Sequence, residues 1–290
     1  MKVIGFLNSA PRGAHFDPHV AAFRAGLKES GCVEGQDVKV IFKWGHGKYA
    51  DLPKMAADLV KRKVNVIATT GGTVSALAAL KATKNIPIFF VSGYDPRKAG
   101  LLKTSNARGV HVSTTESVPK RLALLRQLAP KAKKVAVLLR PGTYVYKREK
   151  ELAKKAGLIV VEADRQSDFR NAFASAIKKG AGALIVCADP YFTSHRKKLI
   201  SLAAANRLPT AYPWREYADE GGLMSFGPNL VDAYRHVGIH AGHFAKHDRH
   251  RGKRVKKHKH SNFELVVNKA VAKALNLTIP RRWSGKVETV

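Results

Sequence analysis

The sequence is poor in acidic residues and in cysteine. Its 290 residues include 21 Asp and Glu against 52 Lys and Arg, which gives a formal net charge of +31. The two cysteines, Cys32 and Cys187, are too few and too far apart for a disulfide framework or a cysteine metal site, so we expect two buried free thiols. No apolar run approaches the roughly 20 residues that a membrane-spanning helix requires. A hydrophobic content of 45% is typical of a globular protein, and the length is sufficient for two lobes.

Motifs of common enzyme classes are missing as well. The sequence has no G-x-S-x-G nucleophile elbow, no P-loop and no Rossmann G-x-G-x-x-G after a predicted strand. The loop TTGGT at residues 69–73 lacks the lysine that a P-loop supplies to phosphates. His195 and Asp189 could form only an acid–base pair without a nucleophile. We therefore expect no catalytic residues and no cofactor.

The amino-terminal sequence MKVIGFLNS does not have the features of a signal peptide. Its single lysine and five-residue apolar run are too short for a signal-peptide core and fit a first β-strand better. The chain is then either cytoplasmic or an exported protein whose signal peptide has been removed.

Positive charge is spread over the whole chain. Residues 1–112 carry 17 Lys and Arg against 7 Asp and Glu, a net +10, and the remaining +21 lies beyond, with a dense basic patch at residues 246–259. Such a surface favours salt-dependent adhesion to polyanions. Nucleic-acid-binding patches usually interleave aromatic and basic residues, whereas HFAKHDRHRGKRVKKHKH contains one aromatic residue, Phe244. A cationic protein that binds polyanions or nucleic acid is the alternative function, beside a merely solvated charged surface.

Apolar, β-branched runs alternate with helical patterns, which is typical of βαβ units and parallel sheets. The first set predicts strands at residues 2–7, 38–42, 64–69, 86–91 and 109–112, with helices at 16–30, 52–63 and 73–83. The second set predicts a helix at 118–128, then strands at 134–138, 158–163, 183–187 and 210–212, with helices at 144–156, 168–179 and 193–206. We expect an α/β fold of two doubly wound parallel-sheet lobes with a cleft between them.

The rest of the chain has too few predicted elements for a third lobe. These are strands at 223–226 and 263–267 and helices at 231–246 and 269–275. We expect them to complete lobe 1, made of residues 1–112 plus about 222–257, and lobe 2, made of residues 113–221 plus about 258–290. The chain then crosses between lobes near Val112, near Gly221 and again at residues 255–262. Several crossovers form a hinge that can open and close on a ligand.

Residues 64–80, VNVIATTGGTVSALAAL, combine a buried strand, a small polar loop and an apolar helix. Glycines let a ligand approach the backbone, threonine hydroxyls donate or cap, and a helix N-terminus carries partial positive charge. The segment therefore predicts either an anion-binding loop or a plain turn with a threonine cap.

Ligands of doubly wound lobes bind beyond the carboxyl ends of the strands. Hydroxyl and N–H groups suit a carboxylate, acidic side chains suit an ammonium group, and aromatic rings can clamp an apolar body. The predicted ligand-binding residues are Ser9, Thr70, Gly72, Thr73 and Asp95 in lobe 1, and Arg140, Tyr144, Asp189, Tyr191 and Trp214 in lobe 2. This set suits an amino acid or a small aromatic acid.

Several of these residues have a structural alternative. Asp95 and Asp189 each precede a proline and could be helix caps or turn residues. Tyr191 and Trp214 could pack between the lobes.

Ordered blocks of sequence run nearly end to end, from Val3 to about Pro280: IGFLNSAP, FRAGLKESGCVEGQDV, ADLVKRKVNVIATTGGTVSALAALKAT, IPIFFVSGYDP, KRLALLRQLAPKAKKVAVL, ADPYFTSHRKKLISLAA and AYPWREYADEGGLMSFGPNLVDAYRHVGIHAG. Together they closely resemble the substrate-binding proteins of a bacterial ABC importer family that includes tryptophan- and tyrosine-type binding proteins. The resemblance implies a type I periplasmic binding fold, capture of a small solute between the lobes, delivery to an ABC permease in the inner membrane, and a periplasmic location. We expect a monomer.

Two segments depart from the family pattern. Residues 246–261 are rich in Lys, Arg and His where the family usually has a short GE-K-P-like loop. Residues 140–144 read RPGTY where the family tends to have an Asn- and Pro-rich loop. Arg140 could pair with an acidic solute or be another surface cation, so the identity of the ligand stays open.

Four histidines form a stripe on the helix predicted at residues 231–246 and just beyond it. Their spacing of i, i+4, i+7 and i+11 places them on one face, and pairs at i, i+4 can chelate zinc, nickel or copper. No carboxylate or cysteine completes the stripe in this pattern, so we predict no physiological metal site and leave open an adventitious binding of metal at the surface. The stripe consists of His236, His240, His243 and His247.

Overall fold

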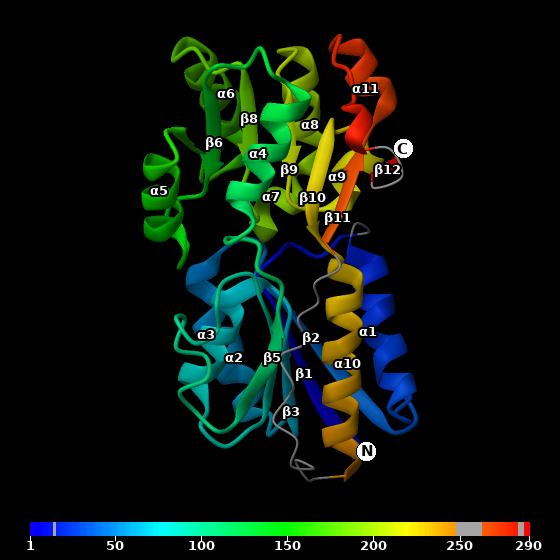
Figure 1. Ribbon diagram of the computed structural model, residues 1–290. Helices are drawn as coiled ribbons and strands as arrows, with labels where there is room; N and C mark the ends of the chain where they lie inside the picture. Colours follow the sequence, from blue (N-terminus) through cyan, green and yellow to red (C-terminus); the bar gives the residue numbers. More distant parts are fainter. Residues whose placement is uncertain (14–15, 248–262, 284–286) are drawn as a thin grey trace. The chain divides into compact units, whose positions relative to one another are not determined.

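The structure is a computed structural model that describes residues 1–13, 16–247, 263–283 and 287–290 (Figure 1). The chain divides into two units, each with its own sheet and core. Unit 1 is Met1–Ser113 with the described part of Leu230–Ser261, and unit 2 is Thr114–Asn229 with the described part of Asn262–Val290. Among the helices described, none combines the length and the apolar character needed to cross a membrane.

Unit 1 contains a five-stranded parallel sheet in the order β2-β1-β3-β4-β5. The central strands are buried along almost their whole length, because their apolar residues are covered by helices on both faces. In Figure 1, α2 and α3 lie on one face of this sheet and α1 and α10 on the other. The strands are β1 (Lys2–Asn8), β2 (Val38–Trp44), β3 (Val66–Thr69), β4 (Ile88–Ser92) and β5 (Ala107–His111); the helices are α1 (Asp17–Glu29), α2 (Leu52–Lys61), α3 (Gly72–Ala82) and α10 (Leu230–His247), with a short 3₁₀ turn, η2 (Tyr49–Asp51), before α2.

Two glycines bring α1 and α10 into close contact. A Cβ on Gly26 would lie 2.0 Å from the backbone oxygen of Arg235, and one on Gly238 would lie 2.1 Å from the backbone oxygen of Phe23. Only glycine allows two helix backbones to approach so closely. This packing attaches α10, which follows unit 2 in the sequence, to the core of unit 1.

Unit 2 contains a seven-stranded sheet in the order β12-β11-β10-β9-β8-β6-β7. Its strands are β6 (Val135–Leu139), β7 (Ile159–Glu162), β8 (Ala183–Val186), β9 (Thr210–Tyr212), β10 (Met224–Pro228), β11 (Phe263–Val267) and β12 (Glu288–Thr289). All neighbouring strands are parallel except β10 and β11, which are antiparallel. The chain leaves unit 2 after the carboxyl end of β10 and returns to begin β11 at the same edge, so β11 must run in the opposite direction.

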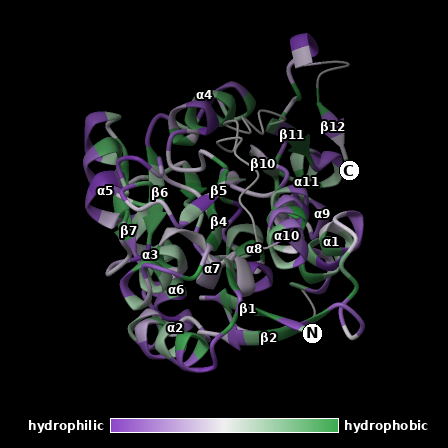
Figure 2. Ribbon diagram, turned by 90° about the horizontal axis from the view of Figure 1, so that it is seen from below, coloured by the Kyte–Doolittle hydropathy of each residue, from purple (hydrophilic) through white to green (hydrophobic). Residues whose placement is uncertain are grey.

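The helices of unit 2 cover both faces of its sheet. In Figure 1, α4 lies in front of the sheet, and α6 and α8, which contact each other, lie behind it. Figure 2 shows α5 coloured largely as hydrophilic, in keeping with its sequence YKREKELAKK. The helices are α4 (Val118–Leu128), α5 (Tyr146–Lys155), α6 (Phe169–Lys178), α7 (Pro190–Ser194), α8 (Arg196–Ala205), α9 (Arg215–Asp219) and α11 (Lys269–Ala274), with 3₁₀ turns η3 (Gln166–Asp168) and η4 (Arg281–Trp283).

The predicted fold class, two doubly wound lobes built on parallel sheets, is confirmed, and both cysteines are buried and free. Three details differ. Residues 222–229, which we expected in lobe 1, belong to unit 2 because β10 pairs with β9 and β11, so the chain crosses after Asn229 and not near Gly221. The single helix expected at residues 193–206 is two helices, α7 and α8, and β11 is antiparallel. The crossover expected at residues 255–262 lies outside the described residues.

Candidate functional site

A buried hydrogen-bond network lies at the carboxyl end of β1 in unit 1. The amide nitrogen of Asn8 donates to Thr70 Oγ1 at 3.1 Å and to the hydroxyl of Tyr234 at 3.0 Å. The Tyr234 hydroxyl in turn donates to the backbone oxygen of Thr70 at 3.2 Å, and Asn8 Oδ1 accepts from the Ala10 N–H at 2.8 Å. These bonds connect β1, the loop after β3 and helix α10. The polar end of the sheet is therefore held in one arrangement.

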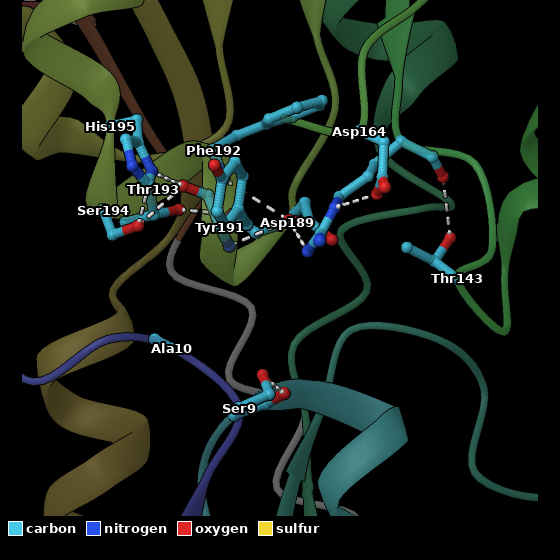
Figure 3. A network of polar contacts seen from close by, with 12 residues as sticks. Ser9, Ala10, Thr143, Asp164, Asp189, Tyr191, Phe192, Thr193, Ser194 and His195 are labelled. Carbon is cyan, nitrogen blue, oxygen red and sulfur yellow. Dashed lines mark hydrogen bonds and ion pairs between the residues drawn. The ribbon is translucent and has the colours of Figure 1, made fainter. Parts of the chain in front are cut away.

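The loop between β3 and α3 is fixed against β1 by Ser9 and Gly71. The Ser9 hydroxyl donates to the backbone oxygen of Gly71 at 2.7 Å, and Figure 3 shows Ser9 beside the first turn of α3. A Cβ on Gly71 would lie only 2.1 Å from the Ser9 nitrogen, so no other residue fits here without displacing the loop. Helix α3 begins at Gly72, whose φ of 78° favours glycine. The N–H groups of this first turn have no acceptor within the helix, as at the start of every α-helix, so the anion-binding role of this loop stays a prediction.

Hydroxyl groups continue this edge of the sheet toward β4. Thr73 Oγ1 lies 2.9 Å from Ser92 Oγ, and the Ser92 hydroxyl donates to the backbone oxygen of Tyr94 at 2.6 Å. Three of the predicted residues, Ser9, Thr70 and Thr73, are thus buried and hydrogen-bonded at neighbouring strand ends.

Asp95 has the structural role that we considered as its alternative. Its Oδ1 accepts from the backbone N–H groups of Arg97 at 2.8 Å and Lys98 at 3.4 Å, which makes it a turn residue. Partial burial alone would raise the pKa of Asp95, but these hydrogen bonds hold the pKa below its ordinary value. Asp95 therefore places an ionised carboxylate after β4.

In unit 2, Arg140 lies after β6 between two carboxylates, those of Asp164 and Asp189, which Figure 3 labels. Its Nε donates to Asp164 Oδ1 at 3.1 Å, and one terminal nitrogen lies 3.6 Å from Asp189 Oδ1. Its side chain is 8% exposed, and its guanidinium carbon lies 4.3 Å from the centre of the Tyr191 ring. One cation and two carboxylates give this group a formal charge of −1. Arg140 is therefore neither a surface cation nor an uncompensated partner for an acidic solute.

Asp189 also caps helix α7. Its Oδ1 accepts from the backbone N–H groups of Tyr191 at 2.8 Å and Phe192 at 3.3 Å. The alternative that Asp189 is a helix cap is confirmed, and the same carboxylate takes part in the Arg140 ion pair. Tyr191 is held on two sides, because its ring centre lies 4.2 Å from that of His195 and its hydroxyl accepts from the Gln166 N–H at 3.1 Å.

The remaining predicted residues differ in exposure. Tyr144 is 46% exposed, in the segment between β6 and α5. Trp214 is 7% exposed and lies between β9 and α9, at the same sheet edge as Asp189 because β9 neighbours β8. Their role in ligand binding stays a prediction, as it does for the other predicted contacts.

Sequence analysis missed two buried charged side chains of unit 2. The Arg121 side chain is completely buried and donates to Ser117 Oγ and to three backbone oxygens, those of Thr114, Val186 and Phe226, at 2.9–3.2 Å. Glu149 accepts from Thr115 Oγ1 at 3.3 Å, and burial, reinforced by the negative charge of Asp189, raises the pKa of Glu149 to about 8.

Both had a sequence signal. Arg121 shares the apolar face of α4 with Leu125 and Leu128, and Glu149 shares one face of α5 with Tyr146 and Ala153, at helical spacing, although seven of the ten residues of α5 are charged.

The histidine stripe of α10 is engaged in other contacts. His236 lies 3.6 Å from Asp232, a carboxylate one turn earlier that the sequence pattern did not include. His240 stacks on Phe89 with ring centres 5.9 Å apart, and His243 stacks on His247. Within the described ranges, no group of three or more potential ligands could hold a metal ion. Residues 248–259 of the predicted basic patch lie outside the described residues.

Residues 12–289 match the sequence model of a family described as ABC transporter substrate binding protein. The chain belongs to this family. The match confirms the resemblance seen in the sequence, and membership of a family of substrate-binding proteins confirms the prediction of a non-enzymatic protein. A curated relative, the tyrosine-binding protein of Clostridioides difficile, is 30% identical over 232 residues, which are 77% of this chain and 66% of the relative. The chain thus spans slightly less than two thirds of that protein.

Solved structures support the fold. An ABC domain from Streptococcus pneumoniae in complex with L-Trp has a TM-score of 0.80 at 22% identity and covers 99% of this chain and 100% of its own. A conserved domain protein from Vibrio cholerae has a TM-score of 0.79 at 22% identity, with 99% of each chain covered. The ligand-free, open structure of a substrate-binding protein with adhesive properties from Clostridium difficile has a TM-score of 0.63 at 26% identity, covering 100% of this chain and 99% of its own.

Proposed function

We propose that this protein is the solute-binding component of a bacterial ABC importer, that it binds an aromatic α-amino acid, and that it delivers this solute to a permease of the inner membrane. It acts as a monomer in the periplasm. The observation that carries the choice of ligand is the group formed by Arg140, Asp164 and Asp189 at the strand ends of unit 2. The family itself supports binding of a small molecule and cooperation with a permease.

The charge of this group favours an ammonium group over a carboxylate. Two carboxylates surround one guanidinium, so an incoming anion would meet a net negative charge. Asp189 is almost completely buried, which strengthens its attraction for a cation that enters the same environment. Asp164 is 55% exposed and can reorient toward a ligand.

The carboxylate of the same solute is proposed to bind to the loop before α3 in unit 1. The first turn of α3 supplies N–H groups, and Ser9, Thr70 and Thr73 supply hydroxyls beside it. An α-amino acid is a small solute that carries both an ammonium group and a carboxylate. The rings of Tyr191 and Trp214 suit an aromatic side chain, in keeping with the L-Trp and tyrosine ligands that the names of two relatives state.

Three indole compounds test this assignment. Tryptophan carries both charged groups, tryptamine lacks the carboxylate, and indole-3-propionate lacks the ammonium group. We expect tryptophan to raise the melting temperature and to bind by calorimetry, with each analogue weaker by about 100-fold or more because one charge-assisted group of bonds is lost. Tyrosine and phenylalanine serve as the matched aromatic series. Binding of indole-3-propionate as tight as that of tryptophan would refute the amino-acid assignment, and the lack of any effect from all five compounds would refute the aromatic class.

A further inference from the structure

The amino ends of three neighbouring strands in unit 2 carry a group of lysines. Helices α4, α5 and α6 precede β6, β7 and β8, and the loops from each helix to its strand meet at one edge of the sheet, because these strands are adjacent and parallel. We call this group the lysine face. It consists of Lys131, Lys133, Lys134, Lys154, Lys155, Lys178 and Lys179, all of them exposed.

Acidic residues are missing from this edge. Residues 129–134, 153–158 and 177–182 contain these seven lysines and no Asp or Glu. The ion pairs described for unit 2 use other cations, such as Arg140, Lys150 and Arg196. Lys179 lies within electrostatic range of Glu162, so the like-charge repulsion that a partner could relieve is mainly that among the other six lysines.

The preference of helices for cations in their last turn explains only part of the pattern. Lys154, Lys155 and Lys178 lie in last turns, where the helix dipole favours them. Lys133 and Lys134 follow the end of α4 by five and six residues, beyond the range of that effect.

The corresponding edge of unit 1 carries cations as well. Arg62, just after α2, pairs with Asp58 at 2.8 Å. Residues 61–65 and 81–87 contain Lys61, Lys63, Lys81 and Lys84 and no Asp or Glu. The lysine face gathers more lysines than these segments, so the lysines of unit 1 are a suitable matched control.

Apolar surface adjoins the lysine face. Ile177, beside Lys178, is 41% exposed. An apolar pocket of about 310 Å³ opens at the amino ends of β9 and β10, next to β8, and is lined by residues that include Arg207, Leu208, Leu223 and Leu275. A lipid bilayer presents anionic headgroups above hydrocarbon, so its surface matches cations that lie next to apolar residues. A nucleic acid has no hydrocarbon layer and fits such a surface less well.

We propose that the lysine face binds the surface of an anionic phospholipid bilayer. The inference rests on the proposed function for one point only, namely that a protein that works with a membrane permease lies next to such a surface. Lysines near an anionic bilayer each contribute about fivefold to the binding constant. Binding at this edge, which is the end of the sheet away from Arg140 and Asp189, leaves the proposed ligand residues of unit 2 accessible.

The test measures co-sedimentation of the full chain with phosphatidylcholine vesicles that contain or lack phosphatidylglycerol. Three variants, each with three charges removed, are compared: K131Q/K133Q/K178Q on the lysine face, K61Q/K63Q/K84Q on unit 1 as the matched control, and K253Q/R254Q/K256Q in the basic patch. We expect binding only to anionic vesicles, a loss of roughly 100-fold in the lysine-face variant, and less than about threefold in the other two. Melting temperature and tryptophan binding are measured on every variant, so a failure of the proposed function shows separately.

Several outcomes would overturn the proposal. Equal losses in all three variants would mean that binding follows net charge alone. A large loss only in the basic-patch variant would move the interaction to that segment. Duplex DNA that binds more tightly than the vesicles at the same salt concentration, and that the lysine-face changes weaken, would identify a nucleic acid as the partner instead.

Discussion

Replacing Glu149 by glutamine should remove a pH dependence of stability that runs opposite to that of most carboxylates. The Glu149 side chain is buried in unit 2, where Asp189, Arg121 and Glu116 are the charged groups that act on it and Thr115 is its hydrogen-bond donor. Burial comes first among the causes that raise its pKa from 4.5 to about 8. The folded state therefore binds a proton that the unfolded state releases between these values.

The sign and size of the effect follow from proton linkage. The stability that Glu149 contributes is fully present below about pH 4.5 and is lost as the pH rises through 8, because only the folded state holds the proton in that window. With these two pKa values, the wild-type protein should lose about 4 kcal/mol relative to the Glu149→Gln variant between about pH 5 and about pH 9. Glutamine is neutral at every pH and can still accept from Thr115.

Urea unfolding of both proteins at about pH 5, 7 and 9 measures this difference directly. The comparison cancels the contributions of other carboxylates, such as Glu162 and Asp168, whose lowered pKa values act in the opposite direction. Glu151→Gln is the matched control, because Glu151 lies on the same helix, is 63% exposed and pairs with Arg148 at 3.6 Å. A wild-type-to-variant difference that stays constant across this range would show that Glu149 is ionised in the folded protein and would refute the reasoning.

Three further substitutions test the strand-end clusters. Asp189→Asn keeps an equally good cap for α7 but removes one of the two carboxylates beside Arg140, so tryptophan affinity should fall about tenfold or more by calorimetry at a temperature where the variant is folded; unchanged affinity would exclude an ammonium contact. Gly71→Ala forces a Cβ against the Ser9 nitrogen, so the free energy of unfolding in urea should fall by about 1–3 kcal/mol and solute binding should weaken. Gly142→Ala is the control: Gly142 lies in an open turn with positive φ, and its replacement should leave solute binding intact. Arg121→Met leaves three buried carbonyls without their donor and should cost about 3–5 kcal/mol; a loss below about 1 kcal/mol would show that water replaces the guanidinium.

The strands could be predicted because a strand that is buried on both faces consists mostly of consecutive apolar residues. Runs such as residues 66–68 and 183–187 are continuously apolar, and in the structure they form most of β3 and all of β8. The position of residues 222–229 could not be predicted in the same way. Both sheets need an additional strand or helix from the end of the chain, and only the pairing of β10 with β9 determines which unit receives it.

Side-chain roles that depend on distant partners were harder to predict than the elements that carry them. Asp189 before proline gives a cap signal within four residues, and the structure confirms the cap. The buried state of Glu149 has only a weak local signal, because Tyr146 and Ala153 lie on its face of α5 but seven of the ten residues in YKREKELAKK are charged. Its environment is created by Thr115 and Asp189, which are 34 and 40 residues away.

The choice of ligand depends on one such distant pairing. Arg140 read from the sequence alone favours an acidic solute as much as a surface position, because an arginine after a strand is a ready partner for a carboxylate. Asp164 follows β7 and Asp189 follows β8, the two strands on either side of β6, so the sheet order brings both carboxylates to the same guanidinium. The pairing changes the net charge of the group from +1 to −1. Under the proposed function, it therefore reverses the sign of the solute group that unit 2 is expected to attract, from a carboxylate to an ammonium.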